Sequence, residues 1–311
     1  MKVVVLGADG FLGSNLTSEL LRMRADIKAF CYPSSRLEKL RDRGVEVLEG
    51  DFTRPETLDI PFDGVDWLVH LASTTTPKES VLEPHKDAAN LTASRVLFQR
   101  AVDAGVKKIL FSSSGGTVYG DAGETPVKET AKTRPVIPYT KTKLAIENEL
   151  AKLTEGTKTV PIVLRFGNPY GPNQYPEKGT GVITAWLRSV RDDKPVVLYG
   201  SGENARDFFY VSDAVSAMLQ SLQSDRARGI YNVGSGSATT LTEVISTIEK
   251  VTCRKASVLK VMGRPSDAVN VIALDSGRAR SDFGWDPRVP LREGIALTWK
   301  WVLDGEKFTI A

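Results

Sequence analysis

The sequence predicts an α/β fold: a parallel sheet with helices on both faces, followed by a smaller mixed α/β lid that binds substrate. Two observations lead to this prediction. Short β-branched or wholly apolar runs, typical of buried strands, alternate with segments whose apolar residues recur at helical spacing. Glycines 7, 10 and 13 lie between the first such strand and the first such helix. Together these features are typical of a Rossmann-type doubly wound sheet.

The composition is that of an ordinary globular protein. The chain has 311 residues, 41% hydrophobic and 25% charged, a length that fits one large or two modest domains. Its net charge of +3 is too small to indicate a nucleic acid or a membrane surface as partner. No apolar run approaches the roughly 18 residues of a membrane helix, and the N-terminal run is too short for a signal peptide. We expect a cytoplasmic protein.

Cysteine and histidine are scarce. Cys31 and Cys253 form neither a disulfide framework nor a metal set, so we expect two reduced, buried thiols and no metal. His70 and His85 are the two histidines, which argues against histidine catalysis. His70 lies inside an apolar strand, and we expect it in the core.

Five strands are expected in the first half, over 2–6, 27–31, 45–51, 67–72 and 108–112. Helical spacing predicts helices over 14–21 and 83–104, and a third from Tyr139 onward. Ligands of such a sheet bind beyond the carboxyl ends of its strands, where Gly7, Asp51, Ala72 and Ser112 lie.

The second half is more mixed. Strands are expected over 160–165, 196–199, 207–211, 230–233 and 258–261, and helices over 181–191, 213–223, 241–250 and 291–304. We therefore divide the chain into residues 1–166 and 167–311, and expect some elements near 207–233 to return to the first domain.

The glycines form the pattern Gly-x-x-Gly-x-x-Gly at Gly7, Gly10 and Gly13. Glycines on a strand-to-helix turn let the backbone approach a pyrophosphate, and the helix N-terminus adds N–H groups and a positive dipole end. The sequence therefore predicts a bound dinucleotide.

The segment after the second strand leaves the type of dinucleotide open. A carboxylate usually stands there to hold the adenosine ribose, whereas this chain has Cys31-Tyr32-Pro33-Ser34-Ser35-Arg36. Ser34, Ser35 and Arg36 can grip a 2′-phosphate, which favours NADP. The alternative is a polar loop that specifies NAD weakly. We expect NAD, held by backbone and serine hydroxyls, with NADP possible and Arg36 in solvent or stacked on the adenine.

Lys143 lies four residues after Tyr139, and no other tyrosine in the sequence has a lysine at this spacing. On a helix the two side chains share one face. The ammonium favours phenolate, so we expect the pKa of Tyr139 to fall from about 10 toward the range of an acid/base catalyst. The loop 112–120, rich in serine and glycine, follows a strand and can present hydroxyls to a substrate oxygen.

These residues together resemble the extended short-chain dehydrogenase/reductase family, in its nucleotide-sugar epimerase/dehydratase branch. The likeness covers nearly the whole chain and is greatest to the UDP-glucose 4-epimerase type. The motifs that carry it are the glycine pattern, Gly50-Asp51, Tyr139-x-x-x-Lys143, and the stretches 165–172, 206–213, 231–234, 264–267 and 284–287.

The resemblance implies a binding role for two sets of residues. The expected dinucleotide contacts are Gly7, Gly10, Phe11, Leu12, Gly13, Tyr32, Ser34, Arg36, Asp51, Phe52, Leu71, Ala72, Asn90, Ser112, Tyr139, Lys143 and Phe166. The expected contacts of a nucleotide-diphosphate sugar, such as UDP-glucose, are Asn168, Arg206, Arg264 and Asp267. Arginine suits this role because its planar fork grips phosphate oxygens two at a time.

The implied mechanism is transient oxidation at sugar carbon 4. Tyr139 removes the 4-hydroxyl proton, NAD takes the hydride, and the keto sugar turns over and takes the hydride back. Lys143 binds the nicotinamide ribose and lowers the Tyr139 pKa. The serine loop departs from the epimerase pattern by one residue: counting back from Val118 places Gly115 where the catalytic hydroxyl belongs, and counting forward from Phe111 places Ser114 there.

We expect Ser114 to supply this hydroxyl, with Thr117 as the second choice. The segment from Ser114 to Thr117 has no carboxylate, which disfavours the elimination and decarboxylation chemistry of related branches.

Three interpretations follow. The first is a nucleotide-sugar 4-epimerase with tightly held NAD. The second is a nucleotide-sugar 4-ketoreductase with exchangeable NADPH, favoured by the missing acid and by Arg36. The third is a non-catalytic dinucleotide-binding protein. The presence of Tyr139 and Lys143 argues against this third interpretation.

The resemblance also implies a homodimer, in which helices near 83–104 and 139–153 pair as a four-helix bundle.

Overall fold

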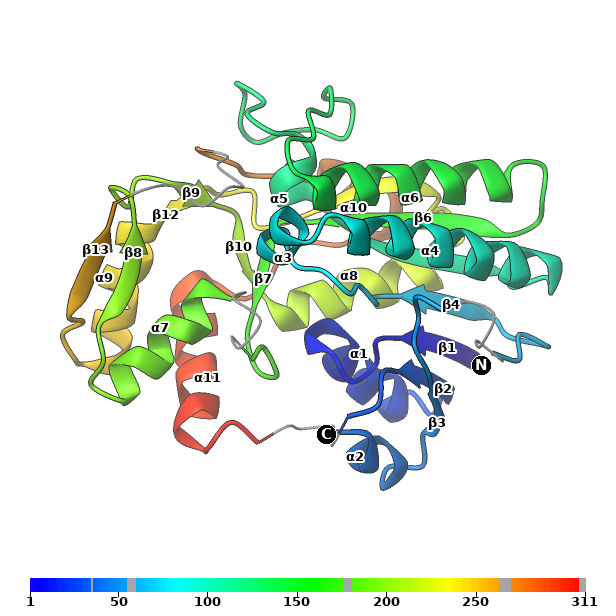
Figure 1. Cartoon of the computed structure of the whole chain (residues 1–311), viewed down its shortest axis with the longest axis horizontal. Helices are drawn as coiled ribbons and strands as arrows, with labels where there is room; N and C mark the ends of the chain where they lie inside the picture. The colour runs from blue at the N-terminus through cyan, green and yellow to red at the C-terminus, as the bar shows by residue number, and fades with distance from the viewer. Residues whose placement is uncertain (35, 55–59, 176–180, 263–269, 308–311) are drawn as a thin grey trace.

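The computed structural model describes residues 1–34, 36–54, 60–175, 181–262 and 270–307. Its centre is a seven-stranded parallel sheet with strand order β11-β6-β5-β4-β1-β2-β3 (Figure 1). In that order the strands are β11 (Gly229–Val233), β6 (Val160–Phe166), β5 (Lys108–Ser114), β4 (Trp67–His70), β1 (Lys2–Leu6), β2 (Asp26–Cys31) and β3 (Glu46–Glu49). The chain leaves β1 toward β2 on one side and later returns to β4 on the other. In doubly wound sheets, ligands bind beyond the carboxyl ends of the strands at such a reversal, which here lies between β1 and β4.

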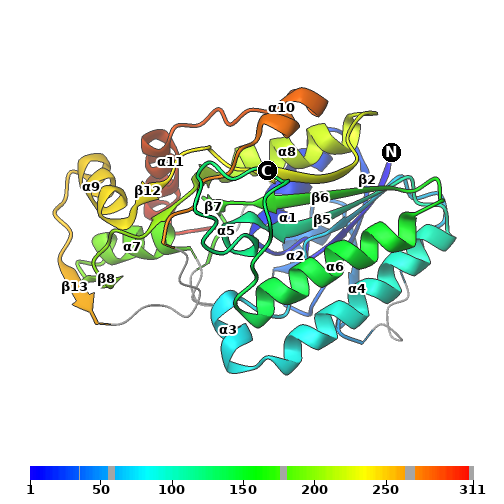
Figure 2. The ribbon, with the colours of Figure 1, turned by 90° about the horizontal axis from the view of Figure 1, so that it is seen from above.

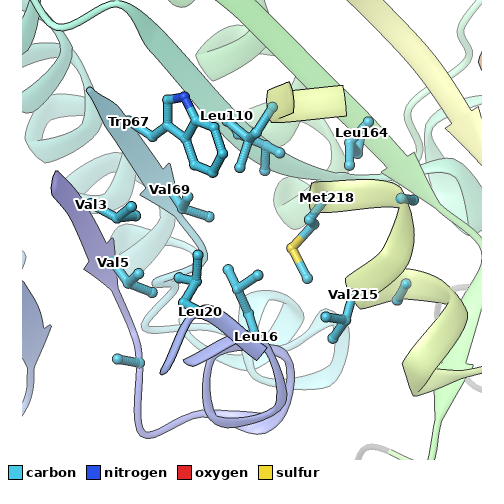
Figure 3. Close-up of a cluster of buried hydrophobic side chains, with 14 of the residues drawn as sticks. Val3, Val5, Leu16, Leu20, Trp67, Val69, Leu110, Leu164, Val215 and Met218 are labelled. Carbon is cyan, nitrogen blue, oxygen red and sulfur yellow. The ribbon is translucent and has the colours of Figure 1, made fainter. Parts of the chain in front are cut away.

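Helices cover both faces of this sheet because its strands are apolar on both sides. Val3 and Val5 of β1 face α1 (Phe11–Arg22) and α8 (Val211–Gln223), as Figure 3 shows, and α2 (Leu37–Arg41) and α10 (Gly277–Phe283) complete this layer. Val4 and Leu6 face α4 (His85–Asp103) and α6 (Pro138–Thr154), which lie side by side on the opposite face (Figure 2).

The smaller part of the molecule projects beyond the carboxyl ends of the strands. Its core is made by α7 (Val182–Arg191), α9 (Leu241–Thr252), α11 (Leu291–Leu303) and β8 (Val196–Tyr199), together with residues of the joining strands described next. The more exposed strand β13 (Val258–Val261) pairs in parallel with β8. Two short pairs join this smaller part to the large sheet, β7 (Asn168–Tyr170) with β10 (Phe208–Tyr210), and β9 (Ala205–Arg206) with β12 (Thr239–Thr240).

The predicted fold class is confirmed, and each strand predicted in the first half is present. Three details differ from expectation. The helix expected over 83–104 is α4, which starts after its N-cap residue Pro84 and is preceded by a separate short helix that was not expected, α3 (Pro77–Leu82). The serine-glycine loop contains a helical turn, α5 (Gly115–Val118). Cys253, expected to be buried, is exposed because it ends α9 at the surface, whereas Cys31 is buried. Within the described ranges, no helix is long and apolar enough to cross a membrane.

Candidate active site

The glycine loop connects β1 to α1 at this reversal in the strand order. Gly7 has a φ of +78°, and its amide donates to the carbonyl of Phe30 in β2 (2.8 Å). A Cβ on Gly13 would overlap with the Gly7 carbonyl and lie 2.7 Å from Cα of Ala8, so no larger residue fits there. No side chain caps the start of α1, which leaves its first N–H groups to a ligand. The loop therefore fits the pyrophosphate of a dinucleotide.

The residues expected around the adenosine occupy varied environments. Tyr32 is 68% exposed, whereas Phe52 is buried in the core, with its ring centroid 5.0 Å from that of His70. Asp51 accepts hydrogen bonds from the amide (2.8 Å) and hydroxyl (2.6 Å) of Thr53, which hold the pKa of its carboxyl below the usual value despite partial burial. The guanidinium of Arg36 lies 4.2 Å over the ring of Tyr175, rather than in solvent. Ser35 lies outside the described residues.

Tyr139 and Lys143 occupy one face of α6, as their spacing predicted. Pro138 begins this helix, where a missing N–H costs nothing. Nζ of Lys143 lies 5.6 Å from the ring centroid of Tyr139 and donates to the carbonyl of Ser112 at the end of β5 (2.9 Å). Lys143 is 6% exposed, and burial lowers its pKa to about 8 even though Glu147 and Asp87 raise it.

The expectation that Lys143 lowers the pKa of Tyr139 is wrong for this geometry. Burial of the phenol, together with the negative charge of Asp87, raises the pKa of Tyr139 to about 12. The spacing of two residues on a helix states which charges are neighbours, but it carries no information on desolvation. The resting phenol therefore keeps its proton at neutral pH.

Asp87 is a residue of this site that the sequence analysis did not single out. It is 2% exposed, and its Oδ1 accepts from the hydroxyl of Thr75 (2.8 Å). Among the described residues, no donor reaches its Oδ2. The available signal was its position in the first turn of α4, three residues before Asn90 and on the same face. Oδ1 of Asn90 accepts from the amide (3.1 Å) and hydroxyl (3.0 Å) of Thr74.

The two hydroxyl candidates after β5 lie together. Oγ of Ser114 is 2.9 Å from Oγ1 of Thr117, which also accepts from the hydroxyl of Thr140, the residue after Tyr139 (3.2 Å). Gly115 has no room for a side chain, because a Cβ there would lie 2.5 Å from Cδ1 of Leu274. Both hydroxyls lie beside the start of α6.

A network of buried polar side chains connects α6 to neighbouring strands of the large sheet. Glu147, one turn after Lys143, accepts from Nε (3.1 Å) and Nη2 (2.6 Å) of Arg165 and from the hydroxyl of Ser113. Nη1 of Arg165 donates to the hydroxyl of Tyr119 (3.0 Å), which donates to Oδ1 of Asn232 (2.6 Å). The network ties α6 to β5, β6 and β11.

The remaining expected dinucleotide residues lie near the carboxyl ends of the strands. The amide of Leu71 donates to the carbonyl of Leu6 (3.1 Å), and the backbone of Ala72 contacts the glycine loop. Phe11 and Leu12 pack in the adjoining cores, and Phe166 stacks on Phe209. His70 is a core histidine as predicted: it is fully buried, Nε2 lies 2.9 Å from Oγ of Ser94, and burial lowers its pKa to about 3.

Two of the expected substrate residues, Asn168 and Arg206, lie on the short strands that join the two parts. Oδ1 of Asn168 in β7 is buried without a partner among the described residues and faces Gly116. Nη1 of Arg206 in β9 donates to the carbonyl of Ala205 (3.1 Å). Arg264 and Asp267 lie outside the described residues.

With this geometry in view, comparison with known proteins identifies the family. Residues 3–234 match the profile of the NAD dependent epimerase/dehydratase family. The chain belongs to that family. It is 33% identical over 302 residues to a dTDP-4-dehydro-6-deoxyglucose reductase of Escherichia coli, covering 94% of this chain and 95% of the relative.

Two solved structures of this NAD-dependent epimerase/dehydratase family share the whole fold. A UDP-glucose 4-epimerase of Thermotoga maritima with UDP-glucose has a TM-score of 0.91 and 29% identity, covering 99% of this chain and 100% of that one. A UDP-glucose 4-epimerase of Thermus thermophilus in complex with NAD has a TM-score of 0.89 and 30% identity, covering 96% of this chain and 98% of that one. The cradle of Gly7, Gly10 and Gly13 fits the dinucleotide on which this family depends.

Proposed function

We propose that this member of the family is an NAD-dependent nucleotide-sugar 4-epimerase that acts on UDP-glucose or a close relative. The observation that carries the proposal is the Tyr139–Lys143 pair beside the hydroxyls of Ser114 and Thr117, at the carboxyl end of β5. A phenol and an ammonium on one helix face, with hydroxyls beside the start of that helix, are suited to moving a proton to and from an alcohol oxygen.

In this proposal the residues of the chain handle the proton and the oxygen. NAD, when bound, supplies the acceptor for the hydride of sugar carbon 4, and its positive ring favours the phenolate. Tyr139 takes the proton of the 4-hydroxyl and later returns it. Lys143, held by the carbonyl of Ser112, binds the nicotinamide ribose. Ser114 or Thr117 orients the 4-oxygen.

The proposed division of labour follows the two parts of the molecule. Residues 1–166, with elements near 207–233, hold the dinucleotide. The rest of 167–311 holds the nucleotide diphosphate through Asn168, Arg206, Arg264 and Asp267.

We also propose a homodimer formed by α4 and α6, which pack side by side on one face of the sheet. A monomeric mass at micromolar concentration, measured by light scattering, would contradict it.

A second candidate is a nucleotide-sugar 4-ketoreductase. It is favoured by the 33% identity to a dTDP-4-dehydro-6-deoxyglucose reductase. The same Tyr139 would then donate a proton to the 4-keto oxygen, and one reduced dinucleotide would be consumed in each turnover.

One pair of assays separates the candidates. The purified protein is incubated with UDP-glucose without added dinucleotide, and the products are separated by chromatography. In parallel, a 4-keto-6-deoxy nucleotide sugar is added with NADPH, and dinucleotide absorbance is followed. An epimerase forms the 4-epimer in the first assay, and a ketoreductase oxidises NADPH in the second. Turnover in neither assay, across UDP and dTDP sugars, would count against both and favour a non-catalytic dinucleotide-binding protein.

A further inference from the structure

A carboxylate lies at the end of β2 although residues 31–36 contain none. It comes from Asp9, inside the glycine loop. The bond from the Gly7 amide to the Phe30 carbonyl (2.8 Å) holds this loop against the end of β2. Oδ2 of Asp9 then accepts a hydrogen bond from the hydroxyl of Ser34, 25 residues later in the chain (3.1 Å). The carboxylate has a defined position at the strand end.

A second neighbour supports this position. The thiol of Cys31, the last residue of β2, is 1% exposed, and burial together with the charge of Asp9 raises its pKa to about 12. In dinucleotide-binding folds, the acid that holds the adenosine ribose usually follows the last residue of the second strand. Here that last residue is Cys31, and the charge of Asp9 acts on its thiol. The hydroxyl of Ser34 also accepts from the amide of Arg36 (3.4 Å), which fixes the Ser34 side chain beside Asp9.

Arg36, the residue that favoured NADP in the sequence, is engaged elsewhere. Its guanidinium lies 4.2 Å over the ring of Tyr175, and its Nη1 donates to the backbone carbonyl of Asp9 (3.5 Å) rather than to the carboxylate. Like charges repel, so a phosphate beside the Asp9 carboxylate would be unfavourable.

We propose that Asp9 selects the dinucleotide: its carboxylate accepts hydrogen bonds from the adenosine ribose hydroxyls and excludes a 2′-phosphate, so that the chain prefers NAD to NADP. Ser34 orients Asp9, and the acid is supplied from the glycine loop instead of from the segment after β2. The inference rests on the proposed dinucleotide site, and it concerns selection of the dinucleotide rather than the sugar chemistry.

The test is titration of the full chain, stripped of bound nucleotide, with NAD and with NADP by calorimetry. We expect the wild type to bind NAD at least tenfold more tightly, which corresponds to about 1.4 kcal/mol. Asp9→Asn keeps the shape of the side chain and removes its charge. It should reduce the ratio of the affinity for NAD to the affinity for NADP at least fivefold. Arg36→Ala is the matched control at the same site, and it should leave the ratio within twofold of wild type.

Two results would overturn the inference: an Asp9→Asn protein with an unchanged ratio, or a wild type that prefers NADP and loses the preference in Arg36→Ala. Asp9→Ser repeats the measurement with a small uncharged side chain if Asp9→Asn fails to fold. A chain that shows the expected ratios and turns over no nucleotide sugar refutes the proposed function and leaves this inference standing. A wild type that binds neither dinucleotide refutes the site itself.

Discussion

Replacing Glu147 by Gln should destabilise the protein strongly, because it leaves Arg165 without its counter-charge. The side chains of Arg165 and Glu147 are 5% and 3% exposed. Burial alone would lower the pKa of Arg165, but the hydrogen bonds and charge of Glu147 raise it above its ordinary value. Breaking a buried pair by removing one partner's charge costs about 3–5 kcal/mol. We expect a loss of that size in the free energy of unfolding.

The assay is urea unfolding followed by tryptophan fluorescence, with ΔG extrapolated to water. Glu149→Gln is the matched control, on the same helix two residues later. Glu149 pairs with Arg95 at 3.4 Å, and the Arg95 side chain is 64% exposed, so its loss should cost about 1 kcal/mol or less. The double variant Glu147→Leu/Arg165→Met removes both charges and should recover at least half of the loss.

A Glu147→Gln protein within about 1 kcal/mol of wild type would refute this reasoning, since the Arg165 charge would then be stabilised without Glu147. A double variant no more stable than Glu147→Gln would instead assign the loss to packing or to the Ser113 hydrogen bond.

Three further predictions concern the candidate site. Tyr139→Phe should leave dinucleotide binding intact and reduce turnover about a hundredfold or more, as measured in the productive assay above, and near-normal turnover would exclude Tyr139 as the acid/base. Asp87→Asn should lower the pKa of Tyr139 from about 12, because the charge of Asp87 adds to the effect of burial. Ultraviolet titration of the phenol, with Tyr139→Phe as background, would detect this decrease, and an unchanged Tyr139 pKa would contradict the prediction. The pKa of Lys143 is about 8 in the folded protein, and its ordinary value is 10.5, so between these pH values the unfolded chain binds more protons than the folded one. The free energy of unfolding should therefore rise with pH across this window, by about 3 kcal/mol. Urea unfolding of Lys143→Met should lack this rise, and a rise of the same size in that variant would assign it to other groups.

The sequence by itself determined the parallel sheet, the glycine loop and the pairing of Tyr139 with Lys143 on one helix face. Each depends on local order: strand and helix periodicities repeat within a few residues, a strand–glycine–helix turn is contiguous, and a spacing of four defines one helix face. These features follow from neighbours in the chain, and the structure has them where the sequence predicted them.

Tertiary structure alone decided the electrostatics of the site. Asp9 reaches Ser34 because β1 and β2 are neighbours in the sheet, and Asp87 acts on Tyr139 because α4 packs on α6. The members of these two pairs are 25 and 52 residues apart in the sequence. The pKa of Tyr139 depends on how much water the assembled fold removes as well as on the nearest cation, and desolvation is a property of packing that no spacing of residues records.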